Sequence, residues 1–126
     1  MNALNIFLAA GAAYVLGGLW YSPFMFGKRW MRLSKKKEKD LKMTPAIVAL
    51  GLVGTLMTAF VFSWLITQTS VQGTLGGMFF GVMLWAGFLL PFAANAVLYK
   101  TTSPQLFLID SLYPLAGLIL MGAILT

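Results

Sequence analysis

The chain has no cysteine and no histidine, and these absences exclude much of the chemistry that proteins perform. Without cysteine there are no disulfides, no thiol nucleophiles and no thioether attachment of haem. Without histidine as well, zinc, copper and iron lose their usual protein ligands. The sequence therefore predicts neither a metal site nor a bound cofactor.

Charged residues are also scarce, at 10% of the 126 residues against 60% for hydrophobic ones. Soluble domains carry roughly a quarter charged residues, whereas a helix that spans a bilayer needs about 20 consecutive apolar residues. Four stretches meet that requirement, at residues 3–22, 45–66, 74–98 and 104–125. We therefore expect an all-α membrane protein, with a single domain over residues 1–126 that forms a four-transmembrane-helix bundle.

Positive charge is confined to one short segment, since every lysine and arginine except Lys100 lies between Lys28 and Lys42. Basic residues beside membrane spans mark the cytoplasmic side. The sequence thus predicts a multi-pass cell-membrane protein with loops 27–43 and 99–103 in the cytoplasm. Both termini and the connection 67–74 are then outside. The net charge of +6 does not indicate nucleic acid, because no soluble fold is available to carry a basic face.

The chain that follows the first span is typical of a membrane–water boundary. Pro23 cannot donate a backbone hydrogen bond, so the first helix is expected to bend or end there. Phe26, Trp30 and Leu33 are then spaced as one helical stripe, which predicts a basic interfacial helix on the inner leaflet. A disordered basic loop is the alternative. The side chains expected to contact anionic headgroups of the inner leaflet are Lys28, Arg29, Arg32, Lys35, Lys36 and Lys37.

Two helix starts are marked in the same way, by Thr44–Pro45 and by Ser103–Pro104. In each pair the hydroxyl residue suits the N-cap and the proline suits the first helical position. The connections 67–74 and 99–103 are short. We therefore expect the second, third and fourth spans to be sequential antiparallel neighbours.

Small residues recur in the third span, where Gly73, Gly77 and Gly81 lie at four-residue intervals. Lipid gives helices little hydrophobic reason to associate, so small residues that let backbones approach closely mark helix contacts. The stripe predicts either packing within one bundle or the interface of a homo-oligomer.

Few polar side chains lie inside the spans, and Asp110 is the one acidic residue there. Five residues fall in the cytoplasmic half and together predict a polar intramembrane site: Asp110, Asn95, Tyr21, Ser22 and Tyr113. In such a site Asp110 is expected to be shielded from bulk water and to bond one of the other four. Alternatively, the fourth span begins after Pro104, and Asp110 lies in its first turn beside the positive end of the helix.

Two prolines inside the spans are expected to break the helical hydrogen-bond pattern. Pro114 leaves the carbonyl of Asp110 without its usual donor, and Pro91 does the same to the carbonyl of Gly87. Transporters use free carbonyl oxygens of broken helices as cation ligands, whereas other membrane proteins tolerate such prolines as kinks.

Three sequence blocks carry a family resemblance: the opening "MNALN", "GLWYSPFMFGKRW", and "LFLIDSLYPLAGLILMGAIL" near the C-terminus. The chain resembles an uncharacterised family of small membrane proteins, domain of unknown function seventeen-sixty-one. The resemblance spans nearly the whole chain and implies a multi-span membrane protein. It supplies no activity and no functional residues.

These observations argue against an enzyme, because one intramembrane acid offers no pair of titrating groups with opposed roles. They favour an integral membrane protein that acts as a small proton- or cation-linked transporter, with no substrate specified. One four-helix bundle has too little interior for a pathway, so transport predicts at least a dimer. The alternative is a non-catalytic structural or lipid-interacting membrane protein.

Overall fold

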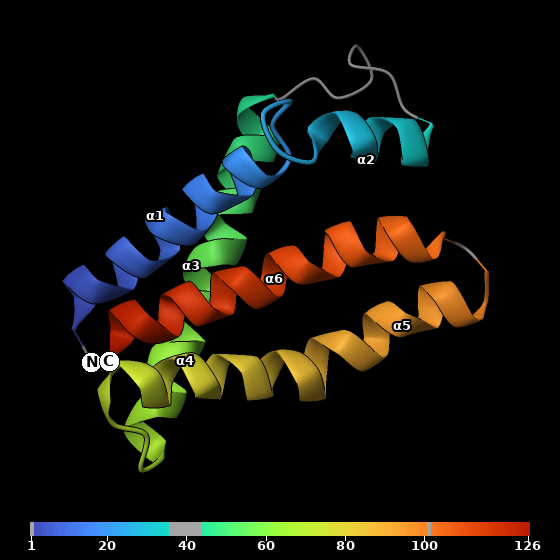
Figure 1. The fold of residues 1–126 in the computed structure, drawn as a ribbon. Coiled ribbons are helices and arrows are strands. Elements are labelled where there is room, and N and C mark those ends of the chain that lie inside the picture. The colour runs from blue at the N-terminus through green and yellow to red at the C-terminus, as the bar shows by residue number, and fades with distance from the viewer. Residues whose placement is uncertain (1, 36–43, 101) are drawn as a thin grey trace.

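The computed structural model describes residues 2–35, 44–100 and 102–126, and every regular element in those ranges is a helix (Figure 1). The elements are α1 (Ala3–Trp20), α2 (Gly27–Ser34), α3 (Pro45–Gln68), α4 (Gly73–Leu84), the π-helical turn η2 (Trp85–Leu89), α5 (Leu90–Leu98) and α6 (Pro104–Leu125). Because α4, η2 and α5 are continuous, Gly73–Leu98 forms one membrane-length helix. With α1, α3 and α6 it makes four helices long and apolar enough to span a bilayer, which confirms the predicted fold class.

The helix starts have the caps that the sequence indicates. The Thr44 hydroxyl accepts a hydrogen bond from the backbone N–H of Ile47 at 3.2 Å. The Ser103 hydroxyl does the same for Leu106 at 3.1 Å, with proline at the first helical position in both cases. Each cap satisfies one backbone donor that the first turn of a helix leaves without an internal partner.

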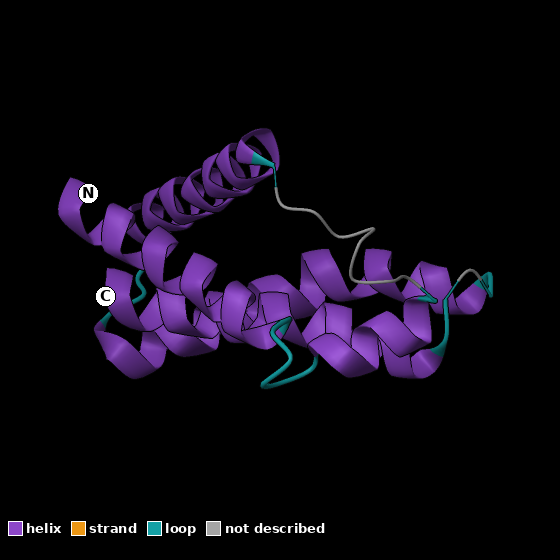
Figure 2. Cartoon of the chain, turned by 90° about the horizontal axis from the view of Figure 1, so that it is seen from above, coloured by secondary structure: helices purple, strands orange, loops and turns teal. Residues whose placement is uncertain are grey.

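The core is built around α1 and α6. Ala9, Ala10 and Ala13 on α1 are buried, and they let α1 pack closely against both α3 and α6. α4 packs along α6 on another side. The expectation that the second, third and fourth spans are sequential neighbours is confirmed for the third and fourth but is wrong for the second and third, which touch at few places. α3 meets α4 at Phe62 and Phe80, whose ring centroids are 5.7 Å apart, and then diverges from it (Figures 1 and 2). α3 therefore packs more extensively against the alanine face of α1 than against α4, although a short connection joins it to α4.

Gly77 and Gly81 face α6 of the same chain. A Cβ atom added at Gly81 would lie 2.5 Å from the carbonyl oxygen of Leu118, and one added at Gly77 would meet the carbonyl of Gly122. Both glycines are buried in this contact, so their stripe packs the bundle and is not free to bind a second copy. Gly73 has an open surrounding and a positive φ of 79°, which places it at the turn into α4 rather than in a helix contact.

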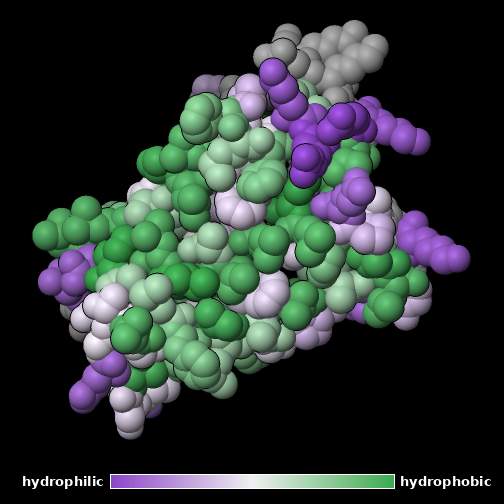
Figure 3. Space-filling model, viewed as in Figure 1, coloured by the Kyte–Doolittle hydropathy of each residue, from purple (hydrophilic) through white to green (hydrophobic). Residues whose placement is uncertain are grey.

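The two ends of the molecule are polar. Both termini lie at one end of the bundle, and α2 lies at the other, near the connection between α5 and α6 (Figure 1). In the space-filling view, hydrophilic side chains gather at these ends and a broad hydrophobic surface lies between them (Figure 3). This is the surface of a protein whose spans face lipid. Lys36 and Lys37 lie outside the described residues.

Candidate functional site

Asp110 joins three elements through one carboxylate oxygen. Its Oδ1 accepts a hydrogen bond from the Tyr21 hydroxyl at 2.8 Å and another from the Trp30 indole Nε1 at 2.9 Å. Tyr21 directly follows α1, Trp30 is on α2, and Asp110 is on α6. Since α6 begins at Pro104 with Ser103 as its cap, Asp110 lies in the second turn of the helix. The alternative that it is a first-turn charge at the helix terminus is therefore wrong.

A tight turn between α1 and α2 brings Tyr21 and Trp30 to the same carboxylate. α1 ends at Trp20, before Pro23, and the N–H of Gly27 donates to the carbonyl of Ser22 at 2.8 Å. A Cβ at position 27 would collide with the backbone carbonyls of this turn, so only glycine fits there. Ser22 belongs to the turn as well. Its hydroxyl donates to the carbonyl of Leu19 at 2.7 Å and makes no bond to Asp110.

Tyr113 supports the site without bonding Asp110. Its hydroxyl donates to the carbonyl of Ala13 at 2.9 Å, which fixes the ring between α1 and α6. The rings of Tyr21 and Tyr113 meet edge to face with centroids 5.8 Å apart, and those of Tyr21 and Trp30 do so at 6.1 Å. Such edge-to-face pairs are the favoured geometry of aromatic contacts. Tyr21 is thus fixed by ring contacts on two sides.

A pocket of about 580 Å³ opens beside this cluster, between α1, α2 and α6. Its walls carry four aromatic rings, from Tyr14, Tyr21, Trp30 and Tyr113, and one carboxylate, from Asp110. The expectation that Asp110 is shielded is wrong for the protein alone, since its side chain is exposed within the pocket. In the described part of the chain the pocket is lined by three helices, α1, α2 and α6, and by the turn between the first two.

The charge of Asp110 has no ionic partner in the described part of the chain. No lysine or arginine there forms an ion pair with it, and Oδ2 receives no hydrogen bond from the described residues. Burial raises the pKa of the neighbouring Tyr21 above its ordinary value of 10.0, and the hydrogen bond to Asp110 raises it further. Tyr21 therefore stays protonated at neutral pH and remains a donor to the carboxylate.

Three of the four tryptophans donate to consecutive residues of α6, a feature that the sequence reasoning missed. Trp20 donates to the carbonyl of Ile109 at 3.0 Å, and Trp85 donates to the carbonyl of Ser111 at 2.8 Å. Trp30 donates to the carboxylate of the residue between them. A partly buried indole N–H needs an acceptor, which is the signal that could have been used. Which acceptor it finds depends on packing that one sequence does not reveal.

Asn95 does not belong to the site, contrary to expectation. In the described residues its side chain is exposed on α5 and makes no hydrogen bond to Asp110. In a regular α-helix Asn95 would lie five turns after Gly77, on the face that packs against α6. The π turn at Trp85–Leu89 adds one residue, and this rotates every later side chain by about 100°. Phe88 and Phe92 are accordingly 69% and 74% exposed.

The two prolines are accommodated differently. Pro91 directly follows the π turn, inside the continuous helix Gly73–Leu98, so the irregular turn takes up the residue that cannot donate. Pro114 lies inside the continuous helix α6, so the carbonyl of Asp110 lacks its usual helical donor.

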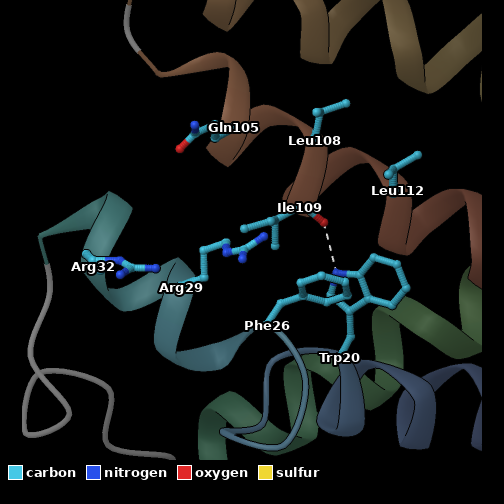
Figure 4. A pocket seen from close by; sticks show the side chains of 8 residues that line it. All are labelled: Trp20, Phe26, Arg29, Arg32, Gln105, Leu108, Ile109 and Leu112. Atoms are coloured by element: carbon cyan, nitrogen blue, oxygen red, sulfur yellow. Dashed lines mark hydrogen bonds between the residues drawn. The ribbon is translucent and has the colours of Figure 1, made fainter.

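A second groove, of about 510 Å³, lies between α2 and the start of α6 (Figure 4). Arg29 and Arg32 project into it from α2, and Gln105 lies across from them on α6. Phe26 packs on Trp20 at its base, with ring centroids 4.8 Å apart. The predicted stripe of α2 is therefore used largely for contacts with the protein: Phe26 packs on α1 and Trp30 bonds to α6, rather than both lying free for lipid. Lys28 and Lys35 are exposed and do not line this groove.

The family described as "Protein of unknown function (DUF1761)" matches residues 4–126. The chain belongs to this family. The matched region contains all four spans except the first residue of α1, together with α2 and the whole Asp110 cluster. No curated protein and no solved structure matches the chain. The description of the DUF1761 family assigns no activity, so the function has to be argued from the site itself.

Proposed function

We propose that this membrane protein binds a monovalent organic cation at Asp110 and carries it across the membrane in exchange for a proton. The observation that carries the proposal is a carboxylate without an ionic partner in the described residues, placed in a pocket with four aromatic walls. Aromatic faces attract cations by about 0.5–2 kcal/mol each, more so where water is excluded. A volume of about 580 Å³ is within the range of small-molecule sites.

The arrangement of donors leaves one carboxylate oxygen for the ligand. Tyr21 and Trp30 both bond Oδ1, which fixes the carboxylate, and no described residue donates a hydrogen bond to Oδ2. An isolated charge costs about 2.5–3.5 kcal/mol at the bilayer centre on insertion scales, and less toward the interface, where the second turn of α6 places Asp110. A bound proton or a bound cation removes that charge. The two therefore compete for Asp110, and this competition couples their movement.

A pathway across the membrane requires more than one bundle, so we propose a homo-oligomer as the transporting unit. Gly77 and Gly81 are occupied by α6 and do not provide the interface. The outer face of α3 is the better surface, since Leu50 and Met57 on it are 72% and 63% exposed and Gly54 is open. The mass of the protein in nanodiscs tests this part, and a strictly monomeric mass would contradict it. We further propose that α2 lies on the cytoplasmic side, from the positive charge around it.

Binding of tetraethylammonium, followed by tryptophan fluorescence, tests the cation site. We expect Asp110→Asn to weaken binding by about tenfold or more, because the amide keeps an acceptor oxygen but removes the charge. Tyr14→Phe, which keeps the ring, should bind like the wild type, whereas Tyr14→Leu should bind more weakly. Trp30→Phe is the control for α2: it removes the hydrogen bond and keeps both the ring and the charge. Unchanged affinity in Asp110→Asn would contradict the proposal.

A second function is favoured by the hydrogen bonds of Asp110 themselves. These bonds hold α2 and the turn before it against α6, so Asp110 has a structural role whether or not it binds a ligand. In that case the protein is a non-catalytic structural or lipid-interacting membrane protein, and Asp110 serves only to attach α2 to α6. The fluorescence experiment separates the two functions, because a protein in which Asp110 is purely structural should show no saturable binding of tetraethylammonium.

A further inference from the structure

The groove between α2 and α6 holds two guanidinium groups whose role is not explained by the Asp110 pocket. Arg29 and Arg32 are one turn apart on α2, and both line the groove that faces α6 (Figure 4). In the described part of the chain neither forms an ion pair. Across the groove, the amide of Gln105 offers a further donor. A planar guanidinium with a fixed fork of donors matches the oxygens of a phosphate.

The polarity of α6 changes along the same groove. Gln105, Leu108 and Leu112 share one helical face, at spacings of three and four residues. Leu108 lies about 4.5 Å deeper than Gln105, and Leu112 about 10 Å deeper. These two leucines are 52% and 36% exposed. Exposed apolar side chains therefore follow Gln105 along this face of α6.

We propose that this groove binds one phospholipid with an anionic headgroup. The headgroup phosphate lies between Arg29, Arg32 and Gln105, and one acyl chain lies along Leu108 and Leu112. A free phosphate ion would use the arginines and leave the leucines bare, whereas a phospholipid matches both parts in their order along α6. The bound lipid bridges α2 and α6, and so holds α2 on the bundle through residues that do not line the Asp110 pocket. This site is independent of the proposed cation site.

The rest of the groove fits a hydrocarbon chain rather than a second polar group. The indole N–H of Trp20 is already bonded to the carbonyl of Ile109, so Trp20 presents only its ring to the groove. Phe26 packs beside it. The polar donors of the groove are thus concentrated at its outer end, at the level of the headgroup.

Native mass spectrometry of the full chain in detergent, titrated with phosphatidylglycerol or with phosphatidylcholine of the same chains, tests the proposal. The decisive variant is the double substitution Arg29→Gln with Arg32→Gln. Lys28→Gln with Lys35→Gln is its matched control, because it removes the same charge from residues on the same helix and at its end that do not line the groove. We expect the arginine variant to lose about tenfold or more in affinity for phosphatidylglycerol, and the lysine variant to change by about twofold or less.

Equal losses in the two double variants would overturn the site, since they would mean that diffuse positive charge attracts the lipid. Two further measurements distinguish a bound lipid from a bound phosphate ion. Leu108→Gln, on the exposed face of α6, should weaken phosphatidylglycerol binding, and inorganic phosphate should fail to displace the lipid. Displacement by inorganic phosphate, or an unchanged affinity in Leu108→Gln, would contradict an acyl chain in the groove. Circular dichroism of each variant checks that the helices are intact.

Discussion

Replacing Gly81 by alanine should destabilise the bundle, because the added methyl group has no room against α6. Its Cβ would lie 2.5 Å from the carbonyl oxygen of Leu118 and 2.8 Å from the carbonyl carbon. An ordinary carbon–oxygen contact is about 3.3–3.6 Å, so the two backbones have to separate by about 1 Å. A gap of that size removes about a quarter to a half of the dispersion attraction of each atom pair at the contact. Overpacking of this kind costs about 1–3 kcal/mol.

The matched control is Gly11→Ala on α1, where nothing lies within 4 Å of the added Cβ. Both substitutions gain the same helix propensity of alanine over glycine, about 1 kcal/mol, so the difference between them isolates the contact with α6. We expect Gly81→Ala to be less stable than Gly11→Ala by about 1–3 kcal/mol.

Unfolding in mixed micelles with increasing dodecyl sulfate, followed by tryptophan fluorescence, measures this difference. Tryptophan emission suits the assay because Trp20 and Trp85 bond to α6 and report its packing. Identical midpoints for the two variants would refute the close packing of α4 on α6. An altered mass of Gly81→Ala in nanodiscs would contradict the assignment of this stripe to the inside of one bundle.

Three further predictions follow from the contacts of α6 and from the distribution of charge. Asp110→Ala leaves the donors of Tyr21 and Trp30 unpaired, so the amide hydrogens of α2 should exchange faster than in the wild type. Asp110→Asn keeps an acceptor oxygen and should protect α2 better, and equal exchange in the two variants would contradict the role of this contact. Trp85→Phe removes the bond to the Ser111 carbonyl and should cost about 1 kcal/mol in the same micelle titration, with no loss if that bond is absent. In a chain without native cysteine, Ser70→Cys should react with an impermeant maleimide from outside the cell and Lys28→Cys only from inside, and the reverse pattern would invert the topology.

Local chemistry made much of the fold predictable from the sequence. Thr44 and Ser103 cap their helices as hydroxyl residues before proline are expected to do. The pairing of Asp110 with Tyr21 was among the expected contacts, because both residues are polar and were predicted to lie in the same half of the membrane. Length and hydropathy also placed the four spans, with α1 ending two residues before the expected boundary at 22.

The position of Asn95, the path of α3 and the bond from Trp30 to Asp110 depend on packing geometry, which the spacing of residue types along the sequence does not determine. A single extra residue in the π turn at Trp85–Leu89 moved Asn95 away from α6, and no local pattern marks that turn apart from Pro91. The divergence of α3 from α4 likewise results from a competition between the alanine face of α1 and the glycine face of α4, which is decided by packing. The bond from Trp30 to Asp110 requires the turn at Gly27, whose direction follows from crowding of its backbone.

Transport of tetraethylammonium into proteoliposomes, driven by an imposed proton gradient, tests the central proposal most directly. Purified wild-type protein should give a saturable uptake and a matching proton movement, reported by a pH-sensitive dye trapped inside the vesicles. Liposomes with Tyr14→Phe should retain uptake, since this variant keeps the carboxylate, both of its hydrogen bonds and the aromatic wall. Asp110→Asn should show no uptake above that of empty liposomes. Uptake by Asp110→Asn at the wild-type rate would contradict the account, because the carboxylate would then have no part in transport.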